Sequence, residues 1–142
     1  MERGKVVFLM DQKPVGPVYL EGHPGLRGRI LFTNATPGDP DAAFVEENDG
    51  SASEIAELVR KGYLVRTRAD ADTVEARTND TRRRDEALKS GAQMVSTDYP
   101  AFEPSKWTGY SVLLPSGTAA RCNPVTAPAG CDTSQLEGSP AH

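Results

Sequence analysis

The sequence predicts an α/β fold built on a parallel sheet, because candidate strands and candidate helices alternate along most of the chain. Residues 6–10 form a wholly apolar run, which is typical of a parallel strand that is covered on both faces. Residues 51–62 combine a capping signal, an apolar stripe at helical spacing and a closing glycine, as expected of a helix. Residues 63–70 then return to the alternation of a strand.

Length and composition limit the classes to which the chain can belong. Its 142 residues suffice for one domain, but 37% hydrophobic residues with 11 prolines and 13 glycines predict a thin core. The net charge is −4, which excludes the polybasic surface typical of nucleic-acid binders. No apolar run has the length of a membrane span, and no secretory-leader pattern stands ahead of residue 6. We expect a chain that opens on a buried strand to be a piece of a longer protein.

The first predicted strand, residues 6–10, ends at Asp11. Asp11 therefore falls at a strand's carboxyl end, where α/β barrels assemble their sites, although an aspartate there also fits a turn. Residues 13–28 are rich in proline and glycine and predict a loop with at most one or two helical turns around 18–20. His23 lies within this loop without a carboxylate fixed near it by spacing, so we interpret it as a structural residue of a turn.

Residues 28–33 predict the next strand, and the segment after it has two possible assignments. If residues 42–45 formed a parallel strand, the connection would be shorter than the dozen or more residues that such a crossover normally takes. Asp39 followed by a proline instead resembles a helix start, so the prediction is a short helix over 40–47. On that assignment the nearby acidic residues are a solvated helix end rather than metal ligands; they are Glu46, Glu47 and Asp49.

Residues 51–54 (SASE) have the capping-box pattern, and the apolar stripe that follows consists of Ile55, Leu58 and Val59. Gly62 is expected to close this helix.

The strand after it is unusual, because Arg66, Arg68 and Asp70 share one face. The opposite face carries Val65, Thr67 and Ala69. Charged side chains on the face away from the helices need a reason, and a barrel interior that binds an anion supplies one, since guanidinium groups match phosphate oxygens.

The rest of the chain predicts one more helix and two more strands. Residues 72–75 have a weaker capping pattern; Val74 stands where an EF-hand loop needs an oxygen ligand, so that assignment is rejected. Residues 81–90 predict a helix stopped by Gly91, with three consecutive arginines, 82–84, interpreted as a solvated face. Residues 94–98 predict a strand with Asp98 at its carboxyl end, and residues 110–114 predict a closing strand.

Beyond residue 117 the sequence predicts an irregular tail, 118–142, of which the last ten residues are expected to be disordered. Cys122 and Cys131 are the chain's two cysteines, nine positions apart in a loop that fits no metal motif. We predict that they form a disulfide, with two unpaired thiols as the alternative. A disulfide would place the protein outside the reducing cytosol.

Several segments together resemble the bacterial calcium-dependent phosphoinositide phospholipase C-like phosphodiesterases, which are TIM-barrel enzymes. The segments are GKVVFLMD, GHPGLRGRILF, GYLVRTRADADT, GAQMVSTDYP and ARCNPV with a later cysteine. The resemblance covers nearly the whole chain. It implies a partial (β/α) barrel over residues 1–117, corresponding roughly to strands four to eight of eight. The family's two catalytic histidines and its calcium ligands lie on the earlier strands, which have no counterpart here.

The resemblance implies cleavage of a phosphoinositide by attack of the inositol 2-hydroxyl, with one histidine as base, another as acid, and calcium stabilising the phosphoryl charge. It implies substrate contacts for Arg66 and Arg68, with Asp11 a further candidate. Asp70 and Asp98 are candidates to hold the arginines or to position a histidine from the missing half. The alternative for these arginines and aspartates is a salt-bridge network that only shapes the barrel.

Two functional hypotheses stay open at this point. The chain is either a phosphodiesterase half that contributes phosphate and inositol binding, or a non-catalytic binding module or inactive truncated remnant. In both cases we expect no hydrolysis by this chain alone. The expected partners are a phosphoinositide or other phosphodiester, and either the missing amino-terminal barrel half or a second copy of the chain. The expected location is extracellular or periplasmic.

Overall fold

The structure is a computed structural model, and it describes residues 6–115 and 117–136. Its strands are β1 (Leu9–Met10), β2 (Phe32–Thr33), β3 (Phe44–Glu46), β4 (Leu64–Arg68) and β5 (Met94–Ser96). Its α-helices are α1 (Gly16–Leu20), α2 (Ala52–Arg60), α3 (Val74–Thr78) and α4 (Arg82–Lys89), with 3-10 turns at Lys13–Val15 and Thr133–Gln135. None of the helices in this part of the chain is long and apolar enough to cross a membrane.

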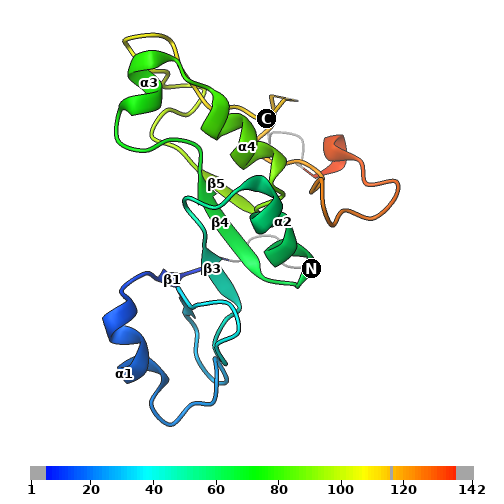
Figure 1. The fold of residues 1–142 in the computed structure, drawn as a ribbon. Coiled ribbons are helices and arrows are strands. Elements are labelled where there is room, and N and C mark those ends of the chain that lie inside the picture. The colour runs from blue at the N-terminus through cyan, green and yellow to red at the C-terminus, as the bar shows by residue number, and fades with distance from the viewer. Residues whose placement is uncertain (1–5, 116, 137–142) are drawn as a thin grey trace, which may run out of the picture.

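The strands form two small parallel sheets that follow the order of the chain (Figure 1). β1 pairs with β2, and β4 lies between β3 and β5. A single parallel bridge from Asn34 to Phe44 connects the two sheets, and another from Pro100 to Val112 continues past β5. The predicted α/β class with parallel pairing is therefore confirmed. Parallel strands in chain order are compatible with part of a barrel, although the described residues do not close into one.

The core lies between the sheet of β3, β4 and β5 and the helix α2. It consists of Ile55, Val59 and Val65, which are nearly inaccessible to solvent, with partly buried Leu58 and Val125 packed against them. The predicted apolar stripe of α2 is thus the face that packs on β4. Val125 belongs to the segment after residue 117, so this part of the predicted tail contributes to the core.

Local signals define both ends of α2. The Ser51 side chain accepts a hydrogen bond from the Glu54 backbone N–H, and the Glu54 carboxylate accepts one from the Ser51 N–H, which completes the predicted capping box. At the other end, Gly62 has a φ of +92°. Its N–H donates to the Val59 carbonyl, and the next N–H, of Tyr63, donates to Leu58. This pair of bonds is a Schellman motif, which needs a left-handed residue where Gly62 stands.

The amino-terminal strands are shorter and less covered than the sequence predicts. Only Leu9–Met10 of the run 6–10 is a strand, and Val6, Val7 and Phe8 are exposed. Only Phe32–Thr33 of the segment 28–33 is a strand. The expectation of burial on both faces is wrong for residues 6–8, because no helix of the described chain packs over them. The predicted helical turn near residues 18–20 is present as α1.

The predicted helix over residues 40–47 is wrong, and the rejected alternative is closer to the structure. Phe44–Glu46 is the strand β3, paired in parallel with β4. The length rule fails here because β2 spans only two residues, so the connection returns over a short distance by turns and carries no helix. The Asp39 carboxylate, which suggested a helix cap, accepts instead from the Thr36 N–H within one of these turns.

The later elements match the sequence in part. The predicted helix 81–90 is α4, and Gly91 follows it with a φ of +79°. The weaker capping pattern is not used, because α3 begins after Thr73 without a side-chain cap bond. The expected closing strand over 110–114 is reduced to the single bridge at Val112.

The disulfide between Cys122 and Cys131 is confirmed, with 6.0 Å between the two Cα atoms. Residues 133–135, expected to be disordered, form a 3-10 turn capped by Asp132, whereas the remainder of the predicted disordered tail, including His142, lies outside the described residues.

Candidate functional site

Polar side chains gather along the edge where the strands end. Asp11 follows β1, Asn34 follows β2, and Glu46 is the last residue of β3. Because all these strands are parallel, their carboxyl ends lie at one edge, which is where open α/β sheets and barrels place their sites. We call this the carboxyl edge; it also includes Asn48, Asp49, Arg66 and Arg68.

Asn34 links the first two strand ends to the third. Its side-chain amide donates to Asp11 Oδ1 at 2.9 Å and approaches Glu46 Oε2 at 3.5 Å. Its side-chain carbonyl accepts from the Glu46 backbone N–H at 3.4 Å. Asp11, a candidate substrate contact, therefore joins the carboxyl edge through Asn34.

Arg66 lies at the centre of the carboxyl edge, on β4, and its side chain is 29% exposed. Its Nη1 donates to Asn48 Oδ1 at 2.8 Å and lies 3.6 Å from Glu46 Oε1. The flanking residues Val65 and Thr67 are buried, so the predicted division of β4 into a charged face and a covered face is confirmed.

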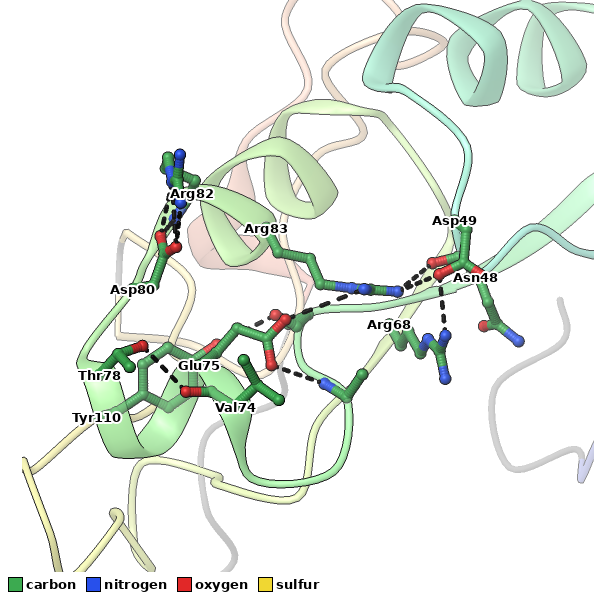
Figure 2. A network of polar contacts seen from close by, with 12 residues as sticks. Asn48, Asp49, Arg68, Val74, Glu75, Thr78, Asp80, Arg82, Arg83 and Tyr110 are labelled. Atoms are coloured by element: carbon green, nitrogen blue, oxygen red, sulfur yellow. Dashed lines mark hydrogen bonds and ion pairs between the residues drawn. The ribbon is translucent and has the colours of Figure 1, made fainter.

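One carboxylate oxygen of Asp49 accepts hydrogen bonds from two arginines, Arg68 and Arg83 (Figure 2). Arg68 Nη2 lies 2.9 Å from Asp49 Oδ1, and Arg83 Nη2 lies 2.6 Å from the same atom. Arg68 comes from β4 and Arg83 from the first turn of α4. Hydrogen bonds from Arg68 and then Arg83 lower the pKa of Asp49, and the bond to Asp49 raises the pKa of Arg68.

Arg83 has two further contacts besides Asp49. Its Nη2 also donates to the Asn48 carbonyl at 2.7 Å, and its Nη1 lies 3.9 Å from Glu75 Oε1. Glu75 is buried on α3, and its other oxygen accepts from the Ala71 N–H at 3.0 Å. The arginine is therefore clamped between α3 and the segment after β3 (Figure 2).

The interpretation of residues 82–84 as a solvated face is correct only for Arg82, which pairs with Asp80 on the surface. Arg83 reaches the carboxyl edge, and Arg84 donates to the Ser111 carbonyl. Consecutive helical residues are about 100° apart, so three in a row cannot all face solvent when one side of the helix is packed. The helical spacing could have indicated that at least one of the three arginines faces the protein. Which one does so depends on how α4 packs.

Asp70 and Asp98 are brought together, although not around an arginine. Asp70 is buried; its carboxylate accepts from the Thr97 hydroxyl at 2.5 Å and from the Asp98 backbone N–H at 3.0 Å. The Asp98 side chain is exposed. Beneath them, the buried Tyr110 hydroxyl donates to the Ala69 carbonyl, and burial and then the charge of Asp70 raise the Tyr110 pKa. Asp70 therefore ties the end of β4 to the end of β5.

His23, Glu46 and Asp49 are each engaged by other groups of the protein. His23 Nδ1 lies 2.9 Å from the Arg27 carbonyl within the turn after α1, as a structural histidine does. Calcium takes six to eight oxygen ligands. Within 6–115 and 117–136 no group of three or more acidic, histidine or cysteine side chains is placed to hold a metal, and Glu46 and Asp49 face guanidinium groups. This arrangement does not fit calcium.

A cavity of about 630 Å³ lies elsewhere, between α4, β5 and the segment 112–124. Leu88, Val95 and Val112 are among its lining residues. It includes none of the arginines of the carboxyl edge, so we do not place the site there.

Comparison with known proteins adds one finding to this geometry. No curated protein and no solved structure matches the chain. Residues 1–124 match the family model described as phosphoinositide phospholipase C, Ca2+-dependent. That match spans most of the 142 residues and includes the whole carboxyl edge. The chain therefore belongs to the family of Ca2+-dependent phosphoinositide phospholipases C.

Proposed function

We propose that this chain forms the phosphate- and inositol-binding side of a phospholipase C-like site, with Arg66 as the principal ligand contact and Arg68 and Asp11 beside it. The observation that carries the proposal is the position of Arg66. It stands on the central strand, at the edge where parallel sheets bind ligands, on the face that the helices do not cover. The family supplies the class of ligand, a phosphoinositide.

The contacts of Arg66 leave room for a ligand. A guanidinium has five N–H groups, and within residues 6–115 and 117–136 both side-chain contacts of Arg66 are made through Nη1. One partner is a neutral amide, and the other, Glu46, lies at 3.6 Å, which is long for a charged hydrogen bond. Phosphate oxygens make shorter and stronger bonds with this group.

Asp70 and Asp98 support the site rather than touch the ligand. The bond from the Asp98 N–H to Asp70 fixes the end of β5 against the end of β4, the strand that carries both arginines. The predicted salt-bridge alternative has its own support, because each arginine has an acidic neighbour. The two accounts differ in what the loss of Arg66 does to ligand binding and to the stability of the fold.

We propose further that the chain does not hydrolyse phosphodiesters alone. The resemblance places the family's histidine pair and calcium ligands on earlier strands, and His23 is engaged in a turn. Loss of both acid and base removes several powers of ten in rate. The proposed partner is a polypeptide that supplies the amino-terminal half of the barrel. The disulfide favours an extracellular or periplasmic setting.

The test is an assay for release of inositol phosphate from phosphatidylinositol with calcium present. We expect background rates from the pure chain, and turnover after an amino-terminal half from a family member is supplied in cis or in trans. His23→Ala should leave the reconstituted rate unchanged. Calcium-dependent turnover by the chain alone that is lost in His23→Ala would contradict the proposal. Binding of inositol phosphate without turnover, even after reconstitution, would favour the non-catalytic module.

A further inference from the structure

Asp49 occupies a position that an anionic ligand would be expected to take. A single carboxylate oxygen lies 2.9 Å from Arg68 Nη2 and 2.6 Å from Arg83 Nη2. An oxygen of a phosphate group placed between two guanidinium groups makes the same pair of bonds. The arginines come from different elements, β4 and α4, so their convergence on one point is a property of the fold and not of one segment.

We propose that Arg68 and Arg83 form an anion site for a phosphate group, and that the Asp49 carboxylate fills this site until the ligand displaces it. This inference rests on the proposed function, since it assumes that phosphate binds at the carboxyl edge. It adds a ligand residue, Arg83, and a competing residue, Asp49. The ligand is a phosphate group with free anionic oxygens, carried either by a soluble inositol phosphate or by a lipid head group.

The Asp49 side chain can move away from this site, whereas Arg83 is held in place by other residues. The Asp49 side chain is 71% exposed, so a rotation about its own bonds releases it into solvent without a backbone change. Arg83 is held independently by the Asn48 carbonyl and Glu75. The Nε atoms of Arg68 and Arg83 are buried and have no hydrogen-bond partner among the described residues, whereas the two side chains as a whole are 35% and 29% exposed.

The local charges agree with displacement. Arg68 and Arg83 share one carboxylate oxygen of Asp49, so departure of Asp49 leaves two facing positive groups. Glu75 stays paired with Arg83 at 3.9 Å, and the charges of Asp72 and Glu75 act on Arg68 without a direct contact. Two guanidinium groups, of which only Arg83 keeps an ion pair, form a site that attracts an anionic phosphate group.

The change in phosphate affinity on removing the Asp49 charge shows whether Asp49 competes with the ligand or positions the arginines. Asp49→Asn keeps the shape of the side chain and removes its charge. If Asp49 competes with the ligand, the dissociation constant for inorganic phosphate should fall on the order of tenfold, as expected for loss of one repelling unit charge near a dianion. If Asp49 instead positions the arginines, its removal should weaken binding. Asp132→Asn is the matched control, an exposed aspartate of the tail with the same change in charge.

The arginine variants test the other half of the site. Arg83→Gln should weaken phosphate binding about tenfold, as loss of one charged hydrogen bond does. Arg82→Gln, the adjacent residue on α4, should leave it unchanged, because Arg82 is 89% exposed and pairs with Asp80.

The experiment is isothermal titration calorimetry of the full chain and these variants with inorganic phosphate, inositol 1-phosphate and phosphatidylinositol vesicles as separate titrants. Tighter binding by Asp49→Asn for the soluble titrants assigns the site to a free phosphate, and a gain confined to vesicles assigns it to the lipid head group. Unchanged or weaker binding of all three overturns the inference. If Arg66→Ala still weakens binding in that case, the proposed function stands; if no variant binds any titrant, both fall.

Discussion

The two sheets of this chain differ in how they are stabilised. The sheet of β3, β4 and β5 packs against α2, and together they contain most of the buried apolar residues of the described chain, including Val65 on β4 and Ile55 on α2. The sheet of β1 and β2 leaves Val6, Phe8 and Ile30 exposed, and α1 has no side-chain cap. The covered sheet therefore carries the packed core and the arginines of the carboxyl edge, whereas the sheet of β1 and β2 lies beside apolar side chains that are exposed.

The largest expected effect tests this difference with one substitution in two places. Ile55 is 1% exposed and Ile30 is 84% exposed. Ile55→Ala should lower the free energy of unfolding by about 2–5 kcal/mol, because it leaves a cavity in the core. Ile30→Ala should change it by less than about 0.5 kcal/mol. Urea unfolding followed by circular dichroism measures both. Equal losses at the two positions would mean that the uncovered sheet packs as tightly as the other.

The disulfide should stabilise the covered sheet selectively. Val125 lies between its cysteines and packs against the core around Ile55. The loop-entropy model gives a contribution of about 2–3 kcal/mol for a ring of this size. The variant with both cysteines replaced by serine should lose that amount and lose hydrogen-exchange protection in β4 and α2. Protection lost in β1 and β2 instead would reverse the comparison.

The smallest expected effect concerns the cap of α2. Ser51→Ala should cost about 1 kcal/mol, whereas Thr73→Ala, at the uncapped start of α3, should cost less. Bonds from the Ser51 hydroxyl and backbone lower the pKa of Glu54. Because this pKa is lowered by folding, the contribution is present above the ordinary value of 4.5 and is lost as pH falls through the folded value. NMR titration should show the Glu54 pKa rising in Ser51→Ala; no change would indicate that the bonds are not formed in solution.

The same contrast explains which parts of the fold follow from sequence. α2 and β4 are predictable because their signals are local: Ser51, Gly62 and the alternation through Val65. β3 is not, because a three-residue strand depends on pairing with β4, which is distant in the chain. The Asp39 side chain does accept a backbone hydrogen bond, as a helix cap would, but the donor is the Thr36 N–H within a turn and no helix follows.

The carboxyl edge was predictable to a similar extent. Arg66 and Arg68 stand out on β4 because they interrupt a strand that should be apolar on both faces. Arg83 was missed, since its direction depends on how α4 packs against the sheet. Asp49 was interpreted as part of a solvated helix end, because residues 40–47 were predicted to be a helix. The strand β3, which replaces that helix, places Asp49 beside the two arginines.

The central claim is that Arg66 serves ligand binding more than folding. Its most direct test is titration of inositol 1-phosphate into Arg66→Ala, together with the melting temperature of the variant and of Arg60→Ala, an exposed arginine at the end of α2. Loss of one charged phosphate contact should weaken binding by about 1.5–3 kcal/mol. The account predicts that weakening with an unchanged melting temperature. A lowered melting temperature with normal binding by the folded fraction would contradict it and leave Arg66 as part of a salt-bridge network.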